Sequence, residues 1–168
     1  DLERRRFQEL SVKPLVITTG VDFEPKFDEG PAKAEREPTV LIVASGNALN
    51  VNSLQTFLRE VWSKRGECLG GLKLRVLGRV CENLTCEDST VELAGYVHDL
   101  ASEYRKALFV VNPVVAGTGL KIKSLEALSY GKALLSTPAG VEGLPDREGQ
   151  LFAVARPGGE FVKRMGIL

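Results

Sequence analysis

A turn with two glycines is the part of this sequence best suited to chemistry. Gly117-Thr118-Gly119 follows the apolar run Phe109–Val111 and precedes a segment of helical periodicity over 122–129. The first turn of a helix has backbone amides without internal partners and the positive end of the helix dipole, so it favours an anion such as phosphate. Glycines let the backbone approach that anion closely. The turn therefore predicts a phosphate-binding site.

Three charged residues beside this turn strengthen the interpretation. Lys121 and Lys123 stand at the start of the expected helix, where cations are unfavourable for the helix itself, and such a conflict is typical of a functional site. At about 100° per residue, Glu126 lies roughly 40° from Ile122, at the edge of the apolar stripe. A carboxylate there can accept hydrogen bonds from both hydroxyls of a ribose. The alternative is a surface salt bridge between Glu126 and Lys123 or Lys121.

Other common site patterns do not occur in the sequence. The turn fits neither a P-loop nor a dinucleotide fingerprint, because Ile122 stands where each pattern needs a further glycine. A zinc site needs more ligands than the single His98 and three scattered cysteines offer, and no Asp-x-Asp motif occurs. We therefore expect no metal site and expect His98 to be a surface or capping residue. No role is assigned to the cysteines, which are Cys68, Cys81 and Cys86.

Short apolar runs that alternate with helical patterns must position this turn. Strands are predicted at 40–43, 72–76, 91–97, 109–111, 133–135 and 151–155. Helices are predicted over 54–62 with Ser53 as N-cap, over 100–108 and over 122–129. Apolar strands that alternate with helices predict an α/β fold, a doubly wound Rossmann-like parallel sheet of about six strands with helices on both faces. Ligands of such sheets bind beyond the carboxyl ends of the strands.

The expected domain spans residues 14–155, with flanking segments at 1–13 and 156–168. A short β-branched run at 15–18 ends in the turn Gly20-Val21-Asp22. Residues 24–38 are rich in charge, proline and glycine, and are predicted to form an exposed connection.

The composition limits the classes of protein to consider. The 168 residues are 43% hydrophobic and 26% charged, which is typical of one globular domain. Lys and Arg number 22 and balance 22 Asp and Glu, so the net charge gives no reason to expect a nucleic-acid partner. The longest apolar stretch, Ala107–Val111, is far shorter than the roughly 20 residues of a membrane span. No signal peptide is recognisable and no Cys-x-x-Cys occurs, so we expect reduced thiols and a cytoplasmic protein.

The block from Asn112 to Leu144 also carries a family resemblance. It contains Gly117-Thr-Gly-Leu-Lys-Ile-Lys-Ser-Leu-Glu-Ala127 and ends in Gly140-Val-Glu-Gly-Leu144. Other matching stretches occur in the same order along the chain: Gly20-Val21-Asp22, Asn50–Trp62, Leu74–Gly78 and Leu93–Leu100. These residues resemble the C-terminal donor-binding domain of GT-B glycosyltransferases, in the family 4-like, group 1 branch.

The resemblance implies a nucleotide-sugar-binding domain of a retaining glycosyltransferase. Such an enzyme transfers a sugar from a nucleoside-diphosphate sugar to an acceptor, and the nucleotide sugar is a substrate, so no cofactor is expected. In the family, the glutamate at the position of Glu126 holds the ribose of the donor. The turn Gly117-Thr118-Gly119, followed by Leu120, faces the diphosphate and the donor sugar, and Lys121 or Lys123 neutralises the diphosphate. No catalytic residue is assigned.

Two positions depart from the family pattern. Thr118 stands where many members have the first glutamate of an E-x7-E pair, and the segment Ser45–Asn50 lacks the Arg and Lys that many members carry after the first strand. GT-B enzymes bind the acceptor on an N-terminal domain. We expect that domain elsewhere in the same polypeptide, with any peripheral membrane association arising from it, and expect the fragment to be inactive alone. The alternative is a nucleotide-binding or protein-interaction module without transfer activity.

Overall fold

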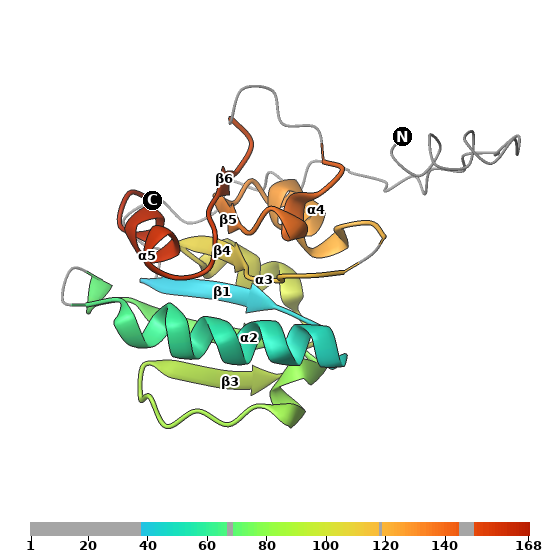
Figure 1. Ribbon diagram of the computed structural model, residues 1–168. Helices are drawn as coiled ribbons and strands as arrows, with labels where there is room; N and C mark the ends of the chain where they lie inside the picture. Colours follow the sequence, from blue (N-terminus) through green and yellow to red (C-terminus); the bar gives the residue numbers. More distant parts are fainter. Residues whose placement is uncertain (1–37, 67–68, 118, 145–149) are drawn as a thin grey trace, which may run out of the picture.

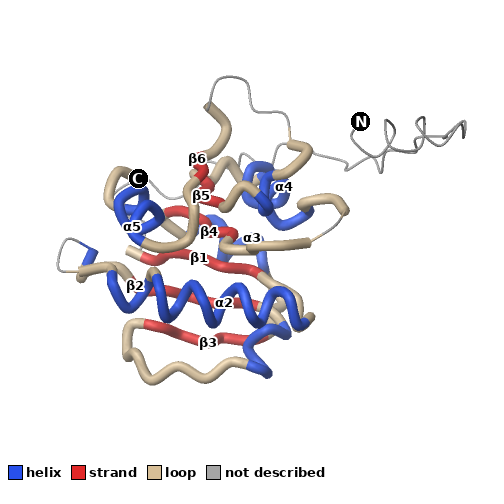
Figure 2. The backbone as a smooth tube through the Cα atoms, viewed as in Figure 1, coloured by secondary structure: helices blue, strands red, loops and turns tan. Residues whose placement is uncertain are grey.

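The computed structural model describes residues 38–66, 69–117, 119–144 and 150–168. They form one α/β domain built on a six-stranded sheet (Figures 1 and 2). The expected strand at 15–18, the turn Gly20-Val21-Asp22, Cys68 and the site residue Thr118 lie outside the described residues.

The sheet has the predicted number of strands, and every pairing within it is parallel. The strands are β1 Thr39–Val43, β2 Lys73–Leu77, β3 Val91–Gly95, β4 Phe109–Asn112, β5 Leu134–Ser136 and β6 Ala153–Val154. Their order in the sheet is β3-β2-β1-β4-β5-β6, so the chain starts in the middle, builds outward to one edge and then to the other. This order confirms the doubly wound fold.

Helices cover both faces of the sheet, as the alternation of buried side chains along the strands requires. Val40 and Ile42 of β1 belong to one hydrophobic cluster and Leu41 to another. The first cluster is covered by α2 Ala48–Glu60 and α5 Gly159–Met165, and the second by α3 Leu100–Lys106 and α4 Ile122–Ser129. In Figure 1, α2 lies in front of the sheet and α3 behind it. The helices predicted over 100–108 and 122–129 are confirmed.

The predicted N-cap of the helix after β1 is wrong. The helix begins at Ala48, and Asn47 caps it by accepting a hydrogen bond of 2.8 Å from the backbone amide of Asn50. Ser53 lies inside the helix and is buried. Its hydroxyl donates to the carbonyl of Leu49 at 2.7 Å and accepts from the amide of Val115 at 3.2 Å. Ser53 therefore connects α2 to the loop after β4 instead of starting the helix.

The segment treated as a C-terminal flank, 156–168, contributes a helix to the core. Phe161 and Met165 of α5 are buried in the cluster under α2, and the rings of Phe161 and Phe57 meet edge to face at 5.7 Å. These contacts join the end of the described chain to the first face of the sheet.

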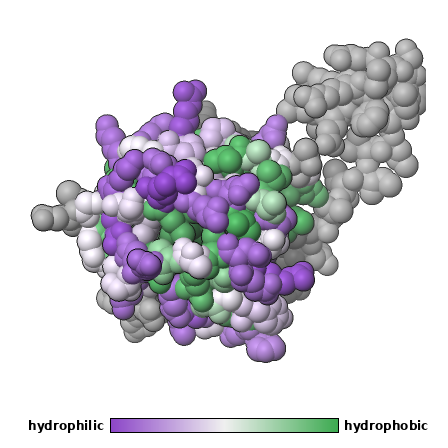
Figure 3. All heavy atoms as spheres, turned by 60° about the horizontal axis from the view of Figure 1, so that its bottom comes forward, coloured by the Kyte–Doolittle hydropathy of each residue, from purple (hydrophilic) through white to green (hydrophobic). Residues whose placement is uncertain are grey.

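The β3 edge of the sheet has the thinnest cover. The β2–β3 connection contains the 3₁₀ segment Arg79–Asn83 and no α-helix among its residues, all of which the structure describes. Side chains of β3 such as Val91 and Leu93 are consequently only partly buried. Figure 3, which turns this side of the molecule forward, shows hydrophobic residues gathered in the middle of the face with hydrophilic residues around them.

Candidate functional site

A pocket of about 210 Å³ lies at the carboxyl ends of β1, β2 and β3. Ser45 follows β1, Arg79 follows β2 and Tyr96 follows β3 in its lining, and Lys123 comes from α4. This is the edge of the sheet at which α/β proteins bind ligands. The loop after β1 and the helix that carries Glu126 thus both contribute a residue to this pocket.

Close backbone packing forms the floor of this pocket. Gly78 has φ of 101°, a conformation that favours glycine, and a side chain there would collide with the carbonyl oxygen of Ala44. The amide of Gly78 donates to the carbonyl of Gly95 at 2.7 Å. These contacts hold the loops after β1, β2 and β3 against one another, so their geometry depends on Gly78.

The glycine turn leads directly into α4. Gly119 has φ of 83°, again a conformation that favours glycine, and the carbonyl of Leu120 accepts from the amide of Ile122 at 2.9 Å. Leu120 is exposed, and Lys121 occupies the N-cap position without a capping hydrogen bond from its side chain. The first turn of α4 therefore carries no side-chain cap among the described residues.

The two lysines of the motif have different surroundings. The side chain of Lys121 is 7% exposed, and its ammonium donates to the carbonyl of Gly117 at 2.9 Å, with a carboxylate oxygen of Glu142 at 3.9 Å. The side chain of Lys123 is 42% exposed and lines the pocket. The structure thus directs Lys121 into the glycine turn and Lys123 toward the space at the sheet edge.

Glu126 lies next to Lys123, and the salt bridge considered from the sequence is present. One carboxylate oxygen, Oε2, accepts from the ammonium of Lys123 at 2.7 Å and from the Tyr104 hydroxyl at 3.2 Å. Among the described residues, none donates a hydrogen bond to the other oxygen, Oε1. Glu126 is 26% exposed, so Oε1 is available to a ligand.

Tyr104 is the residue of this site that sequence reasoning missed. It is fully buried in α3, and its ring stacks on Tyr130 with a centroid distance of 4.6 Å. Burial, with a further contribution from the Glu126 carboxylate, raises the pKa of Tyr104 well above its usual value, so the hydroxyl stays protonated and donates. The helical spacing of the sequence indicated a core residue at this position but not its polar partner.

The apolar stripe expected on α4 is shifted around the helix. Ile122, which belongs to the predicted stripe, is 60% exposed, whereas Ser124 and Ala127 are the buried residues of α4. The reason is a polar network beneath the helix: Ser124 donates to the carbonyl of Gly140 at 2.6 Å and accepts from Asn112 at 2.8 Å. A buried serine with both hydrogen bonds made costs little, so the helix can turn this face inward. The network fixes α4 relative to β4 and the loop after β5.

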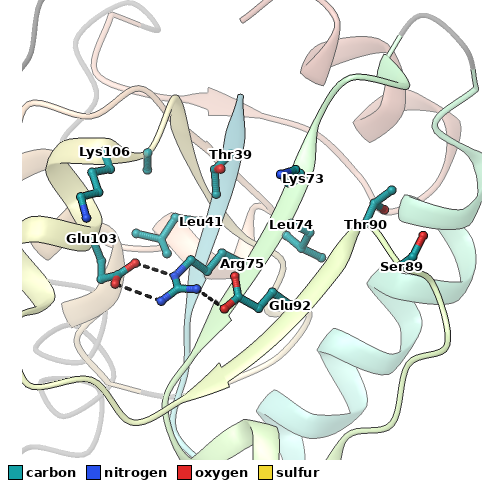
Figure 4. Close-up of a pocket in the computed structure, with 11 residues that line it drawn as sticks. Thr39, Leu41, Lys73, Leu74, Arg75, Ser89, Thr90, Glu92, Glu103 and Lys106 are labelled. Atoms are coloured by element: carbon teal, nitrogen blue, oxygen red, sulfur yellow. Dashed lines mark hydrogen bonds and ion pairs between the residues drawn. The ribbon is translucent and has the colours of Figure 1, made fainter. Parts of the chain in front are cut away.

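A larger cavity, of about 410 Å³, lies at the other end of the sheet. Its lining includes Thr39 and Lys73 at the starts of β1 and β2, and an arginine, Arg75, lies at its centre (Figure 4). The Arg75 guanidinium donates to Glu103 at 2.6 and 3.1 Å and forms an ion pair with Glu92. The charge of Arg75 is thus balanced within the protein, so this arginine is not available to a further anion.

Metal-ligating residues are not gathered into a site in the described part of the chain. No group of three or more His, Cys, Asp or Glu side chains is placed there to hold an ion. His98 is exposed, as expected, and its ring meets that of Tyr96 edge to face at 5.4 Å. None of the described helices is both long enough and apolar enough to cross a membrane.

Comparison with known protein families gives this site its context. Residues 37–166 match the family described as "Glycosyl transferases group 1". The chain belongs to the group 1 glycosyltransferases. The match includes the glycine turn, α4 and the whole described sheet, and it also extends over α5. No curated protein matches the sequence.

Solved structures share the fold of this group 1 glycosyltransferase chain. The crystal structure of TarM is 14% identical, with a TM-score of 0.57 over 79% of this chain and 27% of its own. The apo form of the lipopolysaccharide outer core galactosyltransferase WaaB is 14% identical, with a TM-score of 0.59 over 97% of this chain and 48% of its own.

A third structure with this fold contains a nucleotide. It is a mutant of S. aureus TarM in complex with Fondaparinux, alpha-GlcNAc-glycerol and UDP. It is 14% identical, with a TM-score of 0.61 over 98% of this chain and 34% of its own. The chain thus spans less than half the length of each of these proteins. The likeness identifies the fold as that of a GT-B domain.

Proposed function

We propose that this chain is the donor-binding domain of a retaining hexosyltransferase that uses a nucleoside-diphosphate sugar. The observation that carries the proposal is Glu126, whose Oε1 accepts no hydrogen bond from a described residue and whose Oε2 binds Lys123, a residue that lines the pocket. A carboxylate with a free oxygen can accept hydrogen bonds from ribose hydroxyls, and a lysine one helical turn away can attract the phosphates. The UDP bound to the TarM mutant supports a nucleoside diphosphate as part of the ligand.

Each residue of the motif has a distinct role in this proposal. Glu126 accepts from the ribose through Oε1, while Tyr104 and Lys123 hold Oε2 and fix the orientation of the carboxylate. Lys123 lies close enough to the pocket to neutralise the diphosphate. Lys121 instead stabilises the glycine turn through the Gly117 carbonyl, so that backbone amides of the turn and of α4 face the diphosphate.

These groups favour transfer by stabilising the leaving group. When the bond between the anomeric carbon and the phosphate oxygen breaks, its electron pair stays on the nucleoside diphosphate, which gains negative charge. Helix-end amides and a lysine ammonium aimed at that charge stabilise it more than they stabilise the intact donor. The donor is a substrate in this scheme, and no cofactor takes part.

The acceptor would be bound by a further, N-terminal domain of the same polypeptide. Large apolar side chains are exposed in the loops and at the start of α2 at the carboxyl edge of the sheet, where such a domain would close on the donor: Leu49, Tyr96, Val115 and Leu120. Exposed apolar residues around a polar pocket are typical of an interface. The cytoplasmic location expected from the sequence stays a prediction.

A nucleotide-binding module without transfer activity is the second candidate. It is favoured by the loop after β1, Ser45–Asn50, which contains no cation, since less charge is then available to stabilise a departing diphosphate. The two candidates differ in one measurement. With the acceptor-binding domain present, an enzyme transfers sugar from its donor, whereas a module that only binds nucleotide does not.

Calorimetric titration with UDP, GDP and ADP tests the donor site in the 168-residue chain. We expect one of them to bind, and Glu126→Gln to weaken it by roughly ten- to a hundredfold, as expected when a hydrogen bond to a charged group is lost. Glu87→Gln is the matched control, because Glu87 is exposed in the loop before β3, outside the pocket. Equal binding by the wild type and Glu126→Gln, with both folded by circular dichroism, would contradict the ribose assignment.

A further inference from the structure

The pocket contains a second cation that the family motif does not include. Arg79 follows β2 directly and lines the pocket together with Lys123. It is exposed, and its guanidinium forms no hydrogen bond or ion pair with any residue that the structure describes. Lys123, by contrast, is already paired with Glu126. Arg79 is therefore the cation of this pocket whose charge has no partner within the described protein.

The packing of the neighbouring loop shows why Arg79 lies so close to the end of β1. A Cβ atom at Gly46 would be 3.0 Å from the carbonyl oxygen of Arg79 and 3.4 Å from its Cβ. Gly46 belongs to the loop after β1, which is the loop without a cation. The absence of a side chain at Gly46 thus allows the backbone of Arg79 to pack directly against that loop.

The strand order gives the two cations complementary positions. β1 lies between β2 and β4 in the sheet, Arg79 follows β2, and Lys123 belongs to the helix that follows β4. The two side chains therefore line the pocket from the segments that follow the two strands beside β1. An anion held at the end of β1 would have one cation on each side, which suits a diphosphate with two charged groups.

We propose that Arg79 replaces the cation missing from the loop after β1 and binds the diphosphate of the donor. This inference rests on the proposed function, because it assumes that the pocket takes a nucleoside diphosphate. It goes beyond that function by assigning the second phosphate contact to a residue on another strand. A guanidinium suits this role, since it donates two parallel hydrogen bonds to phosphate oxygens and remains charged at any physiological pH.

The test compares three ligands that differ only in the number of their phosphate groups. The nucleoside diphosphate that the wild-type chain binds best is titrated calorimetrically beside its monophosphate and its nucleoside. We expect Arg79→Gln to weaken the diphosphate about tenfold, to weaken the monophosphate less and to leave the nucleoside unchanged, because only the phosphates carry charge. Arg79→Lys should recover part of the loss, because it keeps the charge but not the two parallel hydrogen bonds. Arg164→Gln, which removes the same charge from an exposed position of α5, is the control and should change nothing.

The outcomes separate this inference from the function on which it rests. If the wild type binds a diphosphate, Glu126→Gln weakens it and Arg79→Gln binds it as well as the wild type does, then Arg79 has no such role and only this inference fails. If Arg79→Gln weakens nucleoside and diphosphate equally and Arg79→Lys restores neither, the residue is structural and the inference also fails. If the wild type binds none of UDP, GDP and ADP, the proposed function itself is wrong and this inference with it.

Discussion

The arginines at the two ends of the sheet differ in whether they have ion-pair partners. In the cavity nearer the amino ends of the strands, Arg75 donates to Glu103 and pairs with Glu92 (Figure 4). Arg65 pairs with Asp88 at 2.8 Å and donates to Thr90, which also lines this cavity. At the carboxyl ends, Arg79 has no partner among the described residues. Both regions contain arginines next to a hollow, and the amino-end hollow is the larger one.

The difference shows that the larger cavity does not contain the arginine without a partner. An arginine that already has two carboxylates gains little from a further anion, because binding the anion would bring like charges together. An arginine without partners has no internal ion pair to give up when it binds one. Arg79 is therefore the arginine more available to an anion, and each prediction below alters one end of the sheet.

The largest effect is expected from Gly78→Ala at the carboxyl end. The new methyl group would collide with the carbonyl oxygen of Ala44, and the φ of residue 78, which is 101°, is strained for alanine. Overpacking and backbone strain together should lower the free energy of unfolding by about 3 kcal/mol. Urea denaturation measures this. Gly71→Ala is the control, since nothing lies within 4 Å of an added Cβ at Gly71 and its φ is not in the restricted range. A change of less than roughly 0.5 kcal/mol for Gly78→Ala would mean that the loops are not packed as described.

Arg75→Met should lower the free energy of unfolding by about 2 kcal/mol. Glu103 and Glu92 lose their shared partner in this variant, and Glu103 is only partly exposed. Arg59→Met removes an arginine from a well-exposed pair and should cost less than roughly 0.5 kcal/mol. Nucleoside-diphosphate binding should be unchanged in both variants. A marked loss of nucleoside-diphosphate binding in Arg75→Met would show that the two ends of the sheet are coupled. The paired Arg75 and the unpaired Arg79 would then not act independently.

Tyr104→Phe should act on the carboxyl end through Glu126. Loss of the hydroxyl leaves Lys123 as the one described donor to Oε2, so nucleoside-diphosphate affinity should fall about fivefold. The free energy of unfolding should fall by about 1 kcal/mol. The ring stack on Tyr130 is kept, which separates the hydroxyl from the packing of the ring. In the Glu126→Gln background the same substitution should have little further effect on affinity. Additive losses would argue against an action through Glu126.

The smallest effect concerns acid stability at the amino end. The hydrogen bond from the Thr90 hydroxyl, with a smaller contribution from Arg65, lowers the pKa of Asp88 from 3.8 to about 2. A carboxylate with a lowered pKa stabilises the fold above its unfolded pKa, and this contribution disappears as the pH falls from about 4 to 2. Thermal melting of Asp88→Asn should therefore show a shallower loss of stability over that range than the wild type. Parallel curves would indicate that Asp88 is not responsible.

Local sequence patterns account for most of the fold. Runs such as Val40–Val43 are apolar at every position because both faces of a parallel strand are covered, and all six strands lie where such patterns predicted them. The bounds of α4 also follow from local signals, because the glycine turn ends one element and the periodicity begins the next. The sequence analysis did not predict α5, although the spacing of Phe161 and Met165 fits one face of a helix. A helix of seven residues has only about two turns, so its periodicity does not stand out.

Which side chains contact one another depends on the tertiary fold. Periodicity placed Lys121 and Lys123 at the same helix start, but the Gly117 carbonyl accepts from one of them, and the other lines the pocket. The local sequence around Ser53 is typical of an N-cap. Its hydroxyl instead accepts from the amide of Val115, which lies in the loop after β4, 62 residues away along the chain. Arg79 lies beside the loop after β1 because β2 is the neighbour of β1 in the sheet and Gly46 leaves room. Local patterns reflect the energy of one segment, whereas such contacts depend on strand order and packing, which no single segment contains.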